Sequence, residues 1–95
     1  MDEDRIAVLD RARALWGEES QVMLALEEMA ELSKELLKNV NRNRDNVREI
    51  AAEIADVYVV LEELKRVYAI SDGEISELIK EKIDRLDRKL RSLGG

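Results

Sequence analysis

The spacing of apolar residues is the feature that most constrains the fold of this chain, because it follows the helical period in four separate stretches. The expected helices are residues 4–16, residues 18–38, a third that continues to about residue 68, and residues 74–93. No stretch of useful length shows the alternation of a strand. The sequence therefore predicts an all-α fold, similar to a four-helix bundle.

The ends of these helices also carry signals. Gly17 is an expected stop, and Asp45 or Asn46 is expected to cap the third helix after a polar linker over residues 39–45. Ser71 and Glu74 have the spacing of a capping box, which would open the last helix.

Length, composition and charge exclude several classes of protein. Ninety-five residues make a single domain, 1–95, with no room for a separate cofactor domain. With no cysteine and no histidine, the chain has no thiol nucleophile, histidine base, disulfide or zinc-finger pattern. A net charge of -6 argues against a broad surface for nucleic acid or anionic membranes. The sequence shows no signal-peptide pattern and no apolar run long enough to span a bilayer, so a cytoplasmic location is expected.

Two acidic clusters lie on stretches that otherwise have the pattern of helices. The first holds Glu27, Glu28 and Glu31, and the second holds Glu53 and Asp56. Residues three apart project from one side of a helix, so two such helices packed as an antiparallel pair would form a cage of oxygens. Oxygen ligands suit Mg²⁺, with Mn²⁺ as an alternative, and such ions mainly hold phosphate groups. The clusters therefore indicate chemistry on phosphate esters or anhydrides.

The positions of the acids relative to the apolar side differ between the clusters. At about 100° per residue, Glu53 falls inside the apolar arc of its helix, and Asp56 falls at the edge of that arc. An ionised carboxylate in such a place is costly unless it is paired or bound to metal. In the first cluster, Glu28 and Glu31 point away from the expected core arc, which consists of Val22, Leu26, Met29, Leu36 and Leu37.

Each cluster has a simpler interpretation. Glutamates three apart on a helix commonly form a solvated face, which is the alternative for Glu27, Glu28 and Glu31. For Glu53 and Asp56 the main alternative is a buried ion pair with an arginine.

The order Glu27-Glu28-x-x-Glu31, 21 residues, then Glu53-x-x-Asp56 resembles the EExxE…ExxD signature of the MazG-like, all-α nucleoside triphosphate pyrophosphohydrolases. The wider stretch 16–64 is similar to short phage and prokaryotic members of that family. The resemblance implies Mg²⁺-dependent hydrolysis between the α and β phosphates of a nucleotide, giving the monophosphate and pyrophosphate. It implies metal ligands at Glu28, Glu31, Glu53 and Asp56. It places the activation of the attacking water on an acid such as Glu27 or Glu28.

Four further residues are candidates for binding substrate. Gln21 lies two helical turns before Glu28 and could donate to a base or phosphate, with a surface amide as its alternative. Trp16 could stack on a base, although packing in the core or against a subunit is the favoured interpretation. Lys34 and Arg44 could reach phosphates, and their alternatives are a surface pair with Glu31 and a solvated loop arginine.

Two classes of function follow. The first is a metal-dependent nucleoside triphosphate pyrophosphohydrolase, and on substrate its alternative is a phosphoribosyl-ATP or dUTP/dCTP pyrophosphohydrolase. The second is a non-catalytic helical module for dimerisation or interaction. Apolar residues point in several directions around the third helix, so a homo-oligomer is expected, either a dimer or a dimer of dimers.

Overall fold

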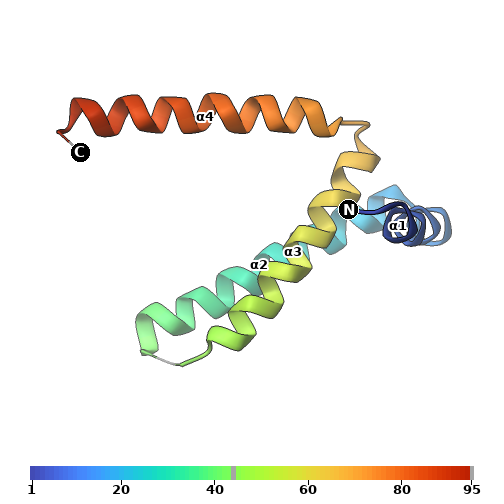
Figure 1. The fold of residues 1–95 in the computed structure, drawn as a ribbon. Coiled ribbons are helices and arrows are strands. Elements are labelled where there is room, and N and C mark those ends of the chain that lie inside the picture. The colour runs from blue at the N-terminus through green and yellow to red at the C-terminus, as the bar shows by residue number, and fades with distance from the viewer. Residues whose placement is uncertain (44, 95) are drawn as a thin grey trace.

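The computed structural model describes residues 1–43 and 45–94, which form four helices and no strand: α1 (Glu3–Trp16), α2 (Glu18–Arg42), α3 (Val47–Val67) and α4 (Asp72–Ser92) (Figure 1). The predicted all-α class is confirmed. Within the described residues, no helix combines the length and the apolar character that crossing a lipid bilayer requires.

Three of the helix ends follow from local chemistry. Asp2 Oδ1 accepts a hydrogen bond from the Arg5 backbone N–H at 2.9 Å and begins α1. Gly17, with φ +89°, ends α1 as predicted, because a side chain would be strained in that backbone conformation. The predicted cap at Ser71 is confirmed, since its Oγ accepts from the Glu74 N–H at 3.1 Å.

The linker between α2 and α3 differs from the prediction. Residues 39–42 are helical and extend α2 to Arg42, so the linker is shorter than residues 39–45. Asn46 precedes α3, yet its side chain makes no capping hydrogen bond. Its Nδ2 instead donates to the backbone oxygen and to Oε2 of Glu35, each at 2.8 Å. These hydrogen bonds tie the start of α3 to α2, and Asn46 itself is buried, at 3% exposure.

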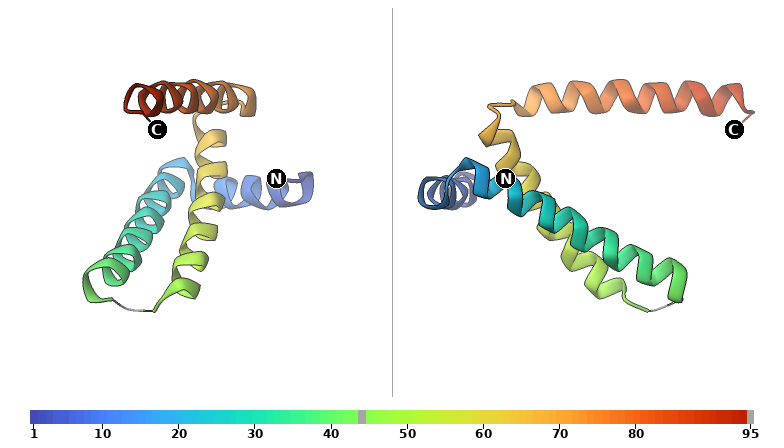
Figure 2. Two further views of the ribbon diagram at one scale, coloured as in Figure 1. Left: turned by 60° about the vertical axis from the view of Figure 1, so that its left-hand side comes forward. Right: turned by 180° about the vertical axis from the view of Figure 1, so that it is seen from behind.

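Helices α2 and α3 form an antiparallel hairpin, and α1 lies beside the end of the hairpin where α2 begins (Figures 1 and 2). Helix α4 turns away after α3 and extends outward (Figure 1). Every described residue from 76 to 94 is exposed. The described residues of one chain therefore do not enclose a four-helix core, and the predicted four-helix bundle is not confirmed.

The side of α2 that faces α3 is not the expected core arc. The buried or half-buried residues of α2 between 21 and 35 are Gln21, Val22, Ala25, Glu28, Leu32 and Glu35. Leu26 and Leu37, expected in the core, are 53% and 59% exposed. Ala25 is 1% exposed, and three of these six residues, Gln21, Glu28 and Glu35, are polar or charged. The most apolar arc of α2 is therefore left for another surface.

Candidate metal centre

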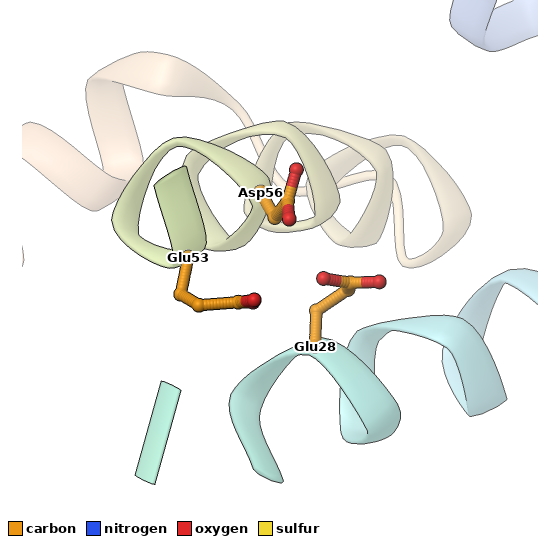
Figure 3. Close-up of side chains that lie close together, drawn as sticks. All are labelled: Glu28, Glu53 and Asp56. Carbon is orange, nitrogen blue, oxygen red and sulfur yellow. The ribbon is translucent and has the colours of Figure 1, made fainter. Parts of the chain in front are cut away.

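The hairpin brings three acids together from its two helices. Glu28 projects from α2, and Glu53 and Asp56 project from α3 toward it (Figure 3). One carboxylate oxygen from each of the three lies within 4.8 Å of the others. Glu28 and Glu53 are half-buried and Asp56 is exposed, so the cluster is closed on its inner side and open to solvent at Asp56. We call these three residues the acidic triad.

The environment of the triad disfavours three negative charges. Burial raises the pKa of Glu28, and the charge of Asp56 and a hydrogen bond with it raise that pKa further. Burial is also the largest cause that raises the pKa of Glu53, and the charges of Asp56 and Glu31 raise it further. The Glu53 Oε2 atom is buried and has no hydrogen-bond partner among the described residues. A cation between the three side chains would relieve the repulsion and give that oxygen a partner.

Glu31 and Glu27, the other two motif acids, lie outside the triad. Glu31 is exposed, but its charge raises the pKa of both Glu28 and Glu53, which places it beside the cluster. Glu27 is also exposed, and it lines a separate surface hollow with Trp16 and Gln21. None of the triad residues lines that hollow. The structure thus groups Glu28, Glu53 and Asp56 and leaves Glu27 on another side of α2.

The predicted substrate-binding residues have different environments. Gln21 is 5% exposed, so a surface amide is the wrong interpretation of it. Trp16 is 63% exposed and is not packed in a core within one chain. Lys34 is exposed and lies close enough to Glu53 for its charge to oppose the rise in that pKa. Arg44 lies outside the described residues.

A buried ion pair with an arginine does exist, but at an acid that the sequence analysis did not single out. Glu63 is 2% exposed and its Oε1 accepts a hydrogen bond from Arg13 Nη1, which joins α3 to α1. Within residues 1–43 and 45–94, no arginine forms an ion pair with Glu53 or Asp56. The helical spacing could have indicated that Glu63 is buried. Glu63 follows the apolar Val60 by three residues and so lies on the same side of the helix.

The donor set limits what the triad can bind. It offers only carboxylate oxygens, which suit a hard cation such as Mg²⁺ or Mn²⁺. Comparisons of this chain with protein-family models, with curated proteins and with solved structures find no match.

Proposed function

We propose that this protein is a Mg²⁺-dependent nucleoside triphosphate pyrophosphohydrolase, with Mn²⁺ as an alternative ion and the cytoplasm as its compartment. One observation carries the proposal: the acidic triad unites the two halves of the EExxE…ExxD pattern in an oxygen-only cluster. The buried Oε2 of Glu53, which lacks a partner in the described residues, supports a cation site over a solvated acidic face.

Glu28, Glu53 and Asp56 would hold the ion, and Glu31 stands beside them as a fourth ligand. A bound Mg²⁺ neutralises phosphate charge and polarises water. An oxygen of Glu28 that does not bind the ion would accept a proton from the attacking water. The reaction adds water across the anhydride between the α and β phosphates, and the products are the monophosphate and pyrophosphate.

One basic residue near the triad, Lys34, could bind phosphate. A surface hollow on the second half of α2 is lined by Lys34, Lys38 and Arg42 among other residues. Lys38 already pairs with Glu35 at 3.2 Å, whereas Lys34 lies near the triad through its effect on Glu53. We assign Lys34 to phosphate binding. Trp16 lines a hollow that holds no triad residue, so its exposed ring is not assigned to this site.

The test is the release of pyrophosphate from a mixture of canonical and modified nucleoside triphosphates with millimolar Mg²⁺. Asp56→Asn and Glu31→Gln should nearly abolish turnover and leave helix content unchanged, because each substitution removes mainly a ligand charge. Glu49→Gln, an exposed position on the same helix as Asp56, is the matched control and should behave as the wild type. Wild-type turnover in both site variants would overturn the assignment.

A second candidate function is a non-catalytic helical interaction module. The observation in its favour is the exposed apolar arc of α2, which includes Leu26 and Leu37. The two candidates differ in one result, because an interaction module would release no pyrophosphate from any nucleotide. If pyrophosphate is released, the order of rates across the mixture then separates a general pyrophosphohydrolase from one acting on phosphoribosyl-ATP, dUTP or dCTP.

A further inference from the structure

Helix α4 carries an apolar stripe that has no covering surface within the described chain. Its residues are spaced alternately four and three apart, at Ile79, Ile83, Leu86, Leu90 and Leu93. These five side chains are between 48% and 74% exposed. An alternating spacing of four and three is the repeat by which two helices pack along a common seam. The stripe therefore matches a partner that is itself a long helix.

The charges of α4 change sign along its length. Residues 72–81 contain four carboxylates and one lysine, whereas residues 82–92 contain five basic side chains and two carboxylates. A second α4 lying parallel would place like-charged halves side by side. A second α4 lying antiparallel would place the acidic half of each helix beside the basic half of the other. The helix dipoles also oppose each other favourably in that orientation.

We propose that α4 pairs antiparallel with α4 of a second copy of this chain. With the pair centred between Ile83 and Leu86, each Ile83 meets Leu86 of the second copy, and each Ile79 meets Leu90. The same register brings Ser76 to the level of Leu93 of the second copy. It also places Lys80 beside the Asp87 of the other helix on one flank of the seam. On the other flank Lys82 approaches Lys89, and both long side chains can extend their ammonium groups into water.

This interface is independent of the proposed metal centre, because no residue of the acidic triad lies on α4. The projection of α4 away from the hairpin leaves the stripe accessible to a second chain (Figure 2). The competing surface is the exposed apolar arc of α2 in a neighbouring chain, and the experiment below distinguishes the two.

The absence of cysteine from the chain allows single thiols to report which positions meet. Ser76→Cys and Leu93→Cys variants of the full chain are mixed, oxidised gently and digested, and the linked peptides are identified by mass spectrometry. The antiparallel pair predicts that links between 76 and 93 dominate. Links of 76 to 76 and 93 to 93 would indicate a parallel pair and overturn the proposal. An absence of links between α4 helices would overturn it as well, since that result favours docking on α2.

A cysteine on the outer side of α4 is the control for random collision. Asp84 lies about half a helical turn from the stripe, so Asp84→Cys should form few links. As a second measurement, Leu86→Lys places a charge at the centre of the seam and should halve the mass measured by light scattering, whereas Asp84→Lys should leave it unchanged. An unchanged mass in Leu86→Lys would contradict the proposed interface.

Discussion

Replacing Arg13 by methionine should destabilise the protein strongly at neutral pH. The substitution keeps the aliphatic stem and removes the guanidinium that pairs with Glu63, whose side chain is 3% exposed. Oε2 of Glu63 already lacks a partner in the described residues, so both carboxylate oxygens would then be unpaired. The result would be an uncompensated charge in a buried place.

Removing one partner of a buried ion pair costs about 3 to 5 kcal/mol, because the remaining charge is left buried and uncompensated. For a domain of this size, that loss corresponds to a fall of roughly 12 to 40 °C in melting temperature.

The assay is thermal melting by circular dichroism at pH 7, with wild type and variant at one chain concentration. Arg11→Met, at an exposed position on the same helix, is the control and should melt as the wild type does. The double variant Arg13→Met/Glu63→Leu should recover most of the stability, because it removes both charges. A defect below about 1 kcal/mol in Arg13→Met, or no recovery of stability in the double variant, would refute the reasoning.

Three other expectations concern the hairpin. Mg²⁺ at about 100 times its dissociation constant should stabilise the native state by roughly 2.7 kcal/mol, or very roughly 10 to 20 °C in melting temperature. In thermal melts with and without Mg²⁺, Glu53→Gln should lose most of this stabilisation. Without metal, the raised pKa values of Glu28 and Glu53 mean that the folded state binds more protons than the unfolded state above the ordinary value of 4.5. Stability should therefore fall as pH rises from 5 to 8 in denaturant titrations, and less steeply in Glu53→Gln. Asn46→Ala should cost about 1 to 3 kcal/mol by losing its hydrogen bonds to Glu35, whereas Asn41→Ala, at an exposed position, should not.

The sequence predicted the helices well because helical periodicity and end signals are local properties. Gly17 and Ser71 act where the pattern placed them, through a positive φ and a side-chain hydrogen bond. Asn46 occupies the predicted N-cap position of α3, but its side chain does not cap the helix. Its amide bonds instead to Glu35 on the other helix, a contact that no local rule contains. The polar linker was predicted too long for a related reason: polar residues at the end of α2 are compatible with helix as well as loop.

The candidate site was predicted in part. Residue spacing was enough to place Glu28 opposite Glu53 and Asp56, because an antiparallel hairpin follows from two adjacent helices and a short connection. Helical projection did not show which side of α2 meets α3. It identifies the most apolar arc, but much of that arc is exposed here, whereas Gln21 and Ala25 are buried and Glu28 is half-buried. Contacts between distant elements, such as Arg13 with Glu63, depend on tertiary packing that periodicity does not encode.

Binding of Mn²⁺, followed by the loss of the free-ion electron paramagnetic resonance signal, tests the proposed metal centre most directly. The titration is carried out with a non-hydrolysable nucleoside triphosphate present, on the wild type, on Glu53→Gln and on the control Glu49→Gln. We expect the wild type and Glu49→Gln to bind at least one ion per chain, and Glu53→Gln to bind far more weakly. Equal binding by Glu53→Gln, or no binding by the wild type at millimolar Mn²⁺, would contradict the assignment of the acidic triad.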